Sequence, residues 1–481
     1  MNQYIPIIGL EIHAELKTQT KMFCNSPNDP DETEPNVNVC PVCLAHPGTL
    51  PVINREAVKY VLKVGAALGG SLADYTEFAR KSYFYPDLPK GYQISQYEFP
   101  LVSGGTLNGV RITRVHLEED TASSVHDEER GTTVIDFNRA GIPLMELVTE
   151  PEIKSAQEAG DFARELQLLL RYLGVADANM EKGEMRVEAN ISVQSTENSK
   201  QKILGTKVEI KNLNSFRAME RAVAHEIKRQ EQLLRDGKKV TQETRGWDEA
   251  KQATFTQRSK EGSADYRYFP DPDLPSLRIS ESSDFSSEAL MKGMPELPWE
   301  RRARYVKMGI KQEDADLLTS ETSLGAYFDE VQKSLPSGVA IQSAANYVTN
   351  DLVKLIRDVQ GRDSGYSPEV PVSARNLTKI LEMVAEKRIS SRVAKDLLYE
   401  CAKDGSDPEA LAVERGLLRV EGGEELSVVV EAILKAHAGV VEDYHRGKES
   451  ALEYLVGQGM KATRGAADPE NLRRIIRTKI R

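Results

Sequence analysis

The 481-residue sequence lacks the features of a secreted or membrane-spanning protein. It contains only four cysteines, too few to suggest a disulfide framework in a chain of this length. No apolar run approaches the roughly 20 residues that a membrane helix needs. Residues 1–16 have no basic segment ahead of their apolar stretch, so we expect no secretory signal. These absences predict a cytoplasmic protein without a membrane partner.

Common catalytic and nucleotide-binding motifs are missing as well. The sequence has no GxxxxGK[ST] phosphate loop, no GxGxxG fingerprint and no GxSxG nucleophile elbow. Cys401 lies in a predicted helix with no histidine close by, and we interpret it as a core residue. Neither a P-loop enzyme nor a serine hydrolase is therefore predicted.

Charge is unevenly distributed along the chain. The net charge of −11 argues against unspecific coating of nucleic acid. Residues 457–481, in contrast, carry seven basic and two acidic side chains. This basic end could hold one polyanion in one place. Alternatively, it is a helix end whose cations lie near the C-terminal dipole.

Sequence periodicity predicts a sheet with helices inserted in it. Residues 4–16, 186–194 and 206–213 alternate between apolar and polar side chains, as half-buried strands do. Helices are predicted at 155–174 and 215–237, each starting at a serine cap and ending at a glycine. Strands so close in sequence favour antiparallel pairing.

The chain divides where this strand pattern stops. Serine, proline and glycine concentrate near residues 280–298, and short helices are predicted at 300–405. Asp407 and Pro408 begin a further helical segment. We therefore predict an α+β fold with an antiparallel-sheet domain at 1–292, an all-α helical domain at 293–406 and a small helical tail domain at 407–481.

Three carboxylates stand side by side at Glu118, Glu119 and Asp120, where like charges repel. Such a run is often solvated surface. A hard divalent cation, which takes oxygen ligands, would also neutralise the repulsion. For Asp120, and for Glu15 on another predicted strand, we prefer the solvated face.

Other acids fall on polar strand faces that one sheet could bring together. Glu11 and His13 share a face of one predicted strand. Glu188 and Glu209 lie on the polar faces of two others. Carboxylates with an imidazole suit Mg²⁺ or Mn²⁺, and Mg²⁺ commonly also binds phosphate oxygens of a substrate. The pattern therefore predicts a metal–nucleotide site, against the alternative of a solvated sheet face.

Two segments rich in proline and glycine combine cations with aromatic side chains. Residues 78–100 place Lys81 and Lys90 among aromatic residues that include Tyr83, and residues 255–275 repeat this mixture. Cations with aromatic rings suit recognition of phosphates and bases. The alternative is aromatic packing at a sheet edge.

A further group suits structural zinc. Cys40 and Cys43 form a C-x₂-C knuckle, Cys24 precedes it, and His46 follows it. Tetrahedral zinc takes four ligands of these types. Free reduced thiols are the equally weighted alternative.

Long motifs in a fixed order resemble one known family. The chain resembles the B subunit of aspartyl/glutamyl-tRNA(Asn/Gln) amidotransferases in the stretches GLEIHAELKTQTKMFC, NVCPVCLAHPGTLPVIN, RKSYFYPDLPKGYQISQYE, HLEEDTA, DFNRAGIPLMELVTEPEI, EIKNLNSF and RSKEGSADYRYFPDPDLP. The likeness continues through NYVTNDL and LVGQGMKAT, so it covers nearly the whole chain.

The resemblance implies a three-subunit, glutamine-dependent carbon–nitrogen ligase. A glutaminase, the A subunit, would release ammonia in a complex that also holds a small C subunit. This chain would use ATP and Mg²⁺ to phosphorylate the side-chain carboxylate of Glu-tRNA(Gln) or Asp-tRNA(Asn), and ammonia from an internal channel would then form the amide. The family fold is a cradle on an antiparallel sheet, then a helical domain and a helical tail that touches the tRNA.

The resemblance also implies roles for particular residues. The catalytic candidates are Glu11, His13, Glu118 and Glu119. The candidate Mg²⁺ ligands are Glu11, His13, Glu118, Glu119, Glu150, Glu188 and Glu209. The candidates for binding substrate and ATP are Lys81, Tyr83, Lys90, Arg139, Lys211, Asn212, Arg258 and Lys260. The candidates for contacting tRNA are Lys461, Arg464, Arg473, Arg474 and Arg477.

The chain departs from the family pattern at Ser26, where zinc-bearing members often carry a cysteine. A zinc site therefore needs His46 or another residue as its fourth ligand.

Two other functions are consistent with the sequence: a non-catalytic tRNA-binding scaffold of a glutaminase complex, and a stand-alone ligase that uses free ammonia. Convergence of the acids around His13 would argue against the scaffold, which has no need of it.

The basic end leads to a first prediction. Removal of residues 408–481 should weaken tRNA affinity and flatten its salt dependence, because each lost phosphate contact lowers the salt slope by about one unit. The amidation rate at saturating tRNA should survive, since the candidate ATP and metal residues precede residue 285. The measurement is amidation rate against tRNA concentration at two salt levels. An unchanged tRNA dependence at both would mean that the basic end is only a capped helix.

Overall fold

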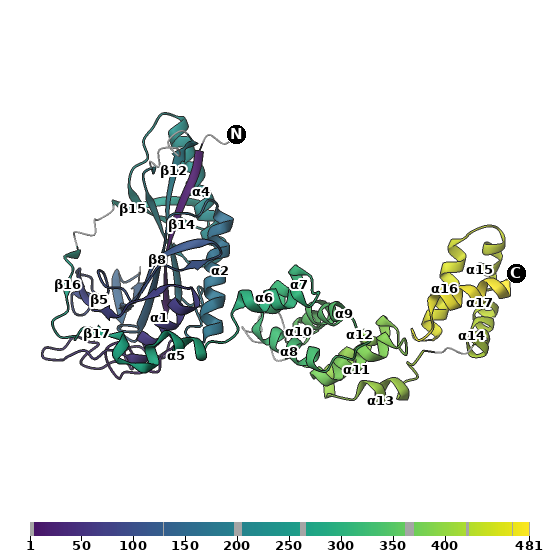
Figure 1. Ribbon diagram of the computed structural model, residues 1–481. Coiled ribbons are helices and arrows are strands. Elements are labelled where there is room, and N and C mark those ends of the chain that lie inside the picture. Colours follow the sequence, from purple (N-terminus) through teal and green to yellow (C-terminus); the bar gives the residue numbers. More distant parts are fainter. Residues whose placement is uncertain are drawn as a thin grey trace. The chain divides into compact units, whose positions relative to one another are not determined.

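The protein consists of two compact units, Met1–Pro298 and Trp299–Arg481. The first contains a large sheet and the second is helical (Figure 1), so the predicted α+β fold is confirmed. Among the described helices, none has both the length and the apolar character to cross a bilayer. The computed structural model describes residues 4–127, 129–196, 204–259, 266–360, 370–419, 423–463 and 465–480.

One ten-stranded sheet forms the frame of the first unit. Its strand order is β15-β14-β13-β12-β1-β11-β8-β6-β2, and β7 pairs with β8. The strands are β1 (Tyr4–Glu15), β2 (Ser71–Leu72), β6 (Val102–Ser103), β7 (Thr106–Leu107), β8 (Val110–Glu119), β11 (Pro143–Thr149), β12 (Met185–Ser195), β13 (Val208–Leu213), β14 (Glu243–Asp248) and β15 (Ala253–Ser259).

Shorter elements surround this sheet. Three small sheets pair β9 with β10, β3 with β17, and β4 with both β5 and β16. These strands are β3 (Tyr75–Thr76), β4 (Ala79–Ser82), β5 (Tyr92–Ser95), β9 (Ser123–Asp127), β10 (Thr132–Asp136), β16 (Phe269–Pro270) and β17 (Leu277–Arg278). The helices of this unit are α1 (Arg55–Ala67), α2 (Ala156–Leu173), α4 (Phe216–Arg235) and α5 (Ser287–Lys292), with 3₁₀ turns at Ile279–Glu281 and Ser283–Phe285.

Pairing in the large sheet is antiparallel with one exception. The exception is β13 with β14, which run parallel. The chain between them forms α4, and a parallel pair needs a crossover connection of this kind. The sequence predicted the helix but not the parallel pair, because alternation within a strand does not reveal the direction of its neighbour.

The apolar strand faces form the core of this unit. Ile8, Leu10, Ile12 and Ala14 of β1 are all at most 1% exposed, so the predicted inward face is confirmed. Figure 1 shows α2 and α4 lying along one side of the sheet, and their apolar stripes supply buried side chains to the same core. Because α2 and α4 cover this face, the polar side chains between the apolar ones point to the other face.

The second unit is helical throughout its described residues and holds two hydrophobic clusters. The first runs from Tyr305 to Ala412 and the second from Leu426 to Ile480. Ala412 belongs to a helix that the sequence assigned to the tail domain, and the boundaries at 292/293 and 406/407 stay predictions. The helices are α6 (Pro298–Lys307), α7 (Gln312–Ser320), α8 (Thr322–Lys333), α9 (Ile341–Asn346), a π-helix (Tyr347–Leu352), α10 (Val353–Gln360), α11 (Ala374–Ala385), α12 (Ser391–Asp404), α13 (Pro408–Glu414), α14 (Gly423–Ala436), α15 (Ala438–His445), α16 (Ser450–Ala462) and α17 (Pro469–Ile480).

The crossover helix α4 leads to a prediction about stability. Ser215 caps it, and its hydroxyl accepts a hydrogen bond from the backbone N–H of Ala218 at 3.1 Å. Ser215→Ala should destabilise the helix by about 1 kcal/mol and speed amide hydrogen exchange in its first turns about fivefold. Ser215→Asp, which keeps a capping oxygen, is the matched control and should exchange as the wild type does. Equal exchange in all three proteins would show that packing alone holds this helix.

Candidate active site

A row of polar side chains crosses four neighbouring strands at one register. His13 of β1 lies opposite Arg186 of β12 and Glu146 of β11. Glu146 in turn lies opposite His116 of β8. The Nε2 atoms of His13 and His116 are each 3.4 Å from Glu146 Oε2. Strand register therefore places one carboxylate between two imidazoles.

Two further acids complete this cluster around His13. Its Nε2 is 3.6 Å from Glu118 Oε1 and 4.0 Å from Glu11 Oε1. The structure thus brings together three predicted residues, Glu11, His13 and Glu118. Sequence reasoning missed Glu146 and His116. A local signal was present, because alternation puts His116 on the same face of β8 as Glu118, and Glu146 is the one charged side chain of the apolar strand β11.

The cluster changes the protonation of its members. Burial disfavours the charged form of His13, but the hydrogen bond to Glu146 and the charges of Glu118 and Glu11 raise its pKa to about 9. For Glu146, burial is outweighed by His116 and His13, which hold its pKa well below the usual value. Burial, with Glu146 and Glu188 nearby, raises the pKa of Glu11. One protonated imidazole therefore offsets part of a dense negative charge.

Three members of the cluster, Glu11, His13 and Glu118, line an open cleft of about 320 Å³. Lys211 enters it from β13, with its Nζ 2.8 Å from Glu188 Oε2. Lys81 is also among its lining residues, and although burial opposes its charge, Glu118 and the surrounding phenols raise the pKa of its ammonium. The predicted residues that line this cleft are Glu11, His13, Lys81, Tyr83, Glu118, Glu188 and Lys211.

The cleft has the donor set of a metal site. Ligand atoms of Glu11, His13 and Glu146 lie within 4.8 Å of one another, and so do those of His116, Glu118 and Glu146. Glu118 Oε2 is buried and has no hydrogen-bond partner among the described residues. A buried carboxylate oxygen without a partner is costly, and a divalent cation with oxygen ligands would satisfy it. The residues present therefore fit Mg²⁺.

The structure separates the three adjacent acids by giving each its own cation. Glu118 faces His13, whereas Glu119 points to the other side of the strand and accepts from Lys90 Nζ at 2.7 Å. Asp120 is bonded to Arg186, which together with Arg139 lowers its pKa against the effect of burial. Asp120 is only 3% exposed, so the prediction of a solvated face was wrong for it. Alternation turns Glu119 away from Glu118 and Asp120, which both line the cleft, and the cation beside each acid offsets the remaining repulsion.

The remaining candidates lie in different places. Glu150 accepts from the Thr113 hydroxyl at 2.7 Å outside the cleft, and Glu209 accepts from Thr244 at 2.7 Å between β13 and β14. Arg139 donates to the carbonyl of Thr121 at the cleft rim. Lys260 lies outside the described residues, as do the side chains of Asn212 and Arg258.

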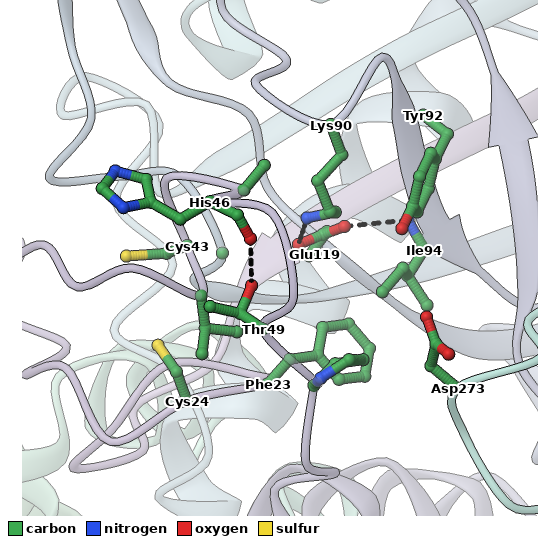
Figure 2. Close-up of a pocket in the computed structure, with 14 residues that line it drawn as sticks. Phe23, Cys24, Cys43, His46, Thr49, Lys90, Tyr92, Ile94, Glu119 and Asp273 are labelled. Atoms are coloured by element: carbon green, nitrogen blue, oxygen red, sulfur yellow. Dashed lines mark hydrogen bonds and ion pairs between the residues drawn. The ribbon is translucent and has the colours of Figure 1, made fainter.

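A second, smaller cavity of about 170 Å³ joins Lys90 and Glu119 to the cysteine cluster (Figure 2). The sulfur atoms of Cys24, Cys40 and Cys43 lie within 4.8 Å of one another. His46 lines this cavity, but its ring nitrogens do not belong to that group of ligand atoms.

Two other side chains reach Cys43 instead. Ser26 Oγ and Lys21 Nζ are each 3.8 Å from Cys43 Sγ. Lys21 is fully buried, and it also donates to the carbonyl of Phe137 at 3.1 Å. Three thiols, a hydroxyl and one buried ammonium therefore make up this cluster, so a fourth zinc ligand would come from Ser26 or water rather than from His46.

The basic end lies on the last helices of the second unit. The apolar side of α17 is buried in the second cluster, as expected for a packed amphipathic helix. Arg473 forms salt bridges within this unit, whereas Arg474, Arg477 and Lys461 are exposed. Arg464 lies outside the described residues. The helix therefore presents some of the predicted tRNA-contacting cations to solvent.

Comparison with known proteins bears on the whole chain. Residues 6–283 match the model of the GatB/GatE catalytic domain, and residues 326–480 match that of the GatB domain. The chain is 42% identical to the B subunit of the aspartyl/glutamyl-tRNA(Asn/Gln) amidotransferase of Carboxydothermus hydrogenoformans, over 100% of this chain and 99% of the relative. Proteins of the same name from Thermus thermophilus and Synechocystis are 45% and 41% identical, and each alignment covers at least 97% of both chains.

The cysteine cluster leads to a prediction about metal content. Ser26→Cys should bind about one zinc ion per chain more tightly than the wild type does, because it places a fourth thiolate beside Cys43. His46→Ala is the control and should leave zinc affinity unchanged. Zinc affinity can be measured by competition with a chelating dye. Loss of zinc on His46→Ala, or no gain on Ser26→Cys, would contradict this ligand set.

Proposed function

The chain belongs to the family of aspartyl/glutamyl-tRNA(Asn/Gln) amidotransferase B subunits, and on that premise we propose that its cleft activates the side-chain carboxylate of a mischarged aminoacyl-tRNA. ATP phosphorylates the carboxylate of Glu-tRNA(Gln) or Asp-tRNA(Asn), and ammonia displaces the phosphate to leave Gln-tRNA(Gln) or Asn-tRNA(Asn). The observation that carries this proposal is the convergence of Glu11, His13, Glu118 and Glu146 beside Lys81.

A carboxylate needs activation because it is a poor electrophile. Conversion of the carboxylate to an acyl phosphate makes phosphate the leaving group when ammonia attacks the carbonyl carbon. No protein nucleophile is required. The protein's task is then to bring two anions together, the carboxylate and the triphosphate. Lys81 and Lys211 supply fixed positive charge in the cleft for that purpose.

The acids of the cleft provide ligands for a metal ion, which the lysines cannot do. Glu118 and Glu146, with His116, would hold Mg²⁺, which when bound neutralises charge on the transferring phosphoryl group. His13 is positioned by Glu146 and Glu118, so its protonated ring can donate a hydrogen bond to an anionic substrate oxygen. Arg186 and Arg139 keep Asp120 ionised and fix the cleft wall around them.

The relatives are named as B subunits, which supports a complex with other proteins. We propose that a glutaminase, the A subunit, supplies the ammonia and that a small C subunit is the third member, with the complex acting in the cytoplasm. Exposed cations of α16 and α17 would contact the tRNA. The three thiols would hold structural zinc with Ser26 or water.

A non-catalytic scaffold is the alternative from another class. A scaffold would gain nothing from a buried Glu118 oxygen that lacks a partner among the described residues, or from three acidic side chains around one histidine. These features cost folding free energy, so their presence favours a catalytic site.

The cleft proposal predicts the behaviour of two variants in the assembled complex. His13→Ala and Glu118→Gln should lower tRNA-dependent ATP hydrolysis at least about a hundredfold, because each removes part of the site that stabilises the phosphoryl group. tRNA affinity should stay nearly intact. Glu150→Gln is the matched control, because Glu150 lies outside the cleft. Full activity in both cleft variants would eliminate the metal–nucleotide site.

The division of labour within the complex gives another expected result. The pure chain should not hydrolyse glutamine, because its sequence shows no recognisable amidase constellation. With ammonium as donor it should retain measurable amidation of mischarged tRNA. Glutamine hydrolysis by the chain alone, followed as glutamate release, would contradict this division.

A further inference from the structure

An exposed aromatic groove of about 310 Å³ lies among Tyr97, Tyr268 and Phe269. The rings of Tyr97 and Tyr268 stack almost parallel, with centroids 4.4 Å apart and an interplanar angle of 14°. Tyr97 is 45% exposed and Phe269 46% exposed. Large flat apolar surfaces that are left open to water commonly mark a binding site, and these would suit a planar ligand.

A chain of contacting rings links the groove to the acidic cleft. The Tyr268 ring is 6.2 Å from the ring of Tyr266, and Tyr266 is 6.0 Å from Tyr83. Tyr266 and Tyr83 both line the cleft. The ammonium of Lys81, which lines the cleft, lies 5.1 Å from the centroid of the Tyr266 ring. A ligand seated in the groove would therefore have its other end within reach of the cleft.

The polar lining limits the charge of that ligand. Glu77 and Glu98 border the groove, and Arg267 is the cation in its lining. A triphosphate would meet two carboxylates there and only one guanidinium, whereas the acids of the cleft are accompanied by several cations and by the donor set of a metal site. A nucleoside with a single phosphate suits this lining, since Arg267 can bind one phosphate and a glutamate can accept from an exocyclic amine of the base. Arg267 also adopts a left-handed φ of 49°, a strained conformation for a non-glycine residue of the kind often found at functional sites.

We propose that this groove stacks the terminal nucleobase of the aminoacyl-tRNA, so that the esterified amino acid projects into the cleft. This proposal rests on the proposed function and assigns the position of its substrate. Stacking on tyrosine gives affinity without reading sequence, because every base has a flat face. It suits an enzyme that must hold a single-stranded tRNA end and present its amino acid in one orientation.

Tyr97→Ala in the assembled complex tests the proposal. The KM for aminoacyl-tRNA should rise about tenfold, since one stacking surface is lost, while kcat and the KM for ATP stay unchanged. Tyr97→Phe keeps the ring and should behave as the wild type. Phe255→Ala, on β15, removes a similarly exposed ring outside the groove and is the control.

A binding measurement on the wild-type complex separates this proposal from the proposed function. Uncharged tRNA whose 3′-terminal nucleotide lacks its base should bind about tenfold more weakly than intact tRNA, and Tyr97→Ala should bind both equally. This readout needs no amidation, so it stands even if the complex fails to amidate.

Equal binding of both tRNAs by the wild type would overturn the proposal without any variant. So would a rise in the KM for ATP alone, which would place the adenine of ATP in the groove. Failure of the complex to assemble, with unchanged tRNA affinity, would make the groove a protein interface and would also overturn it.

Discussion

The electrostatic balance on one face of the large sheet is the constraint on which the rest of this structure depends. Register brings Glu146 between His13 and His116, with Glu11 and Glu118 beside them. Such a concentration of carboxylates is stable only with positive charge nearby. The protein supplies that charge through His13 and the cleft lysines, and it leaves one buried oxygen of Glu118 without a partner among the described residues. The excess of carboxylates lowers the stability of the fold, but it favours binding of a metal ion, and the cleft lysines favour binding of phosphate.

The architecture around the cleft follows from covering the other face of the sheet. With α2 and α4 packed on the apolar face, the polar face is free to bind a ligand. Alternation then sorts neighbouring residues into separate environments: Glu118 enters the cleft, while Glu119 is bonded to Lys90 in the cavity beside the thiols. Adjacent acids thus serve two sites through one strand. The candidate active site and the cavity beside the thiols therefore lie on opposite sides of β8.

Local patterns predicted much of this fold. The inward face of β1, the serine caps at Ser155 and Ser215 and the start of α13 after Asp407 are confirmed, because each depends on residues near in sequence. The parallel pair of β13 and β14 was missed, since pairing direction is a property of the chain's path. Family resemblance and strand faces together selected Glu11, His13 and Glu118. They missed Glu146, whose importance comes from its register with His13 on the neighbouring strand. They also misjudged Asp120, because its burial depends on Arg186 from β12.

In the proposed reaction, the cleft transfers a phosphoryl group from ATP to the side-chain carboxylate before the amide forms. The most direct measurement traces the oxygen atoms of the side-chain carboxylate with ¹⁸O. Mischarged tRNA whose side-chain carboxylate carries ¹⁸O at both positions is converted by the complex with ATP and ammonia, and the released phosphate is analysed by mass spectrometry. Activation by phosphorylation predicts one ¹⁸O in each phosphate released and the other retained in the amide. Label in AMP, or phosphate without ¹⁸O while the amide accumulates, would contradict the account.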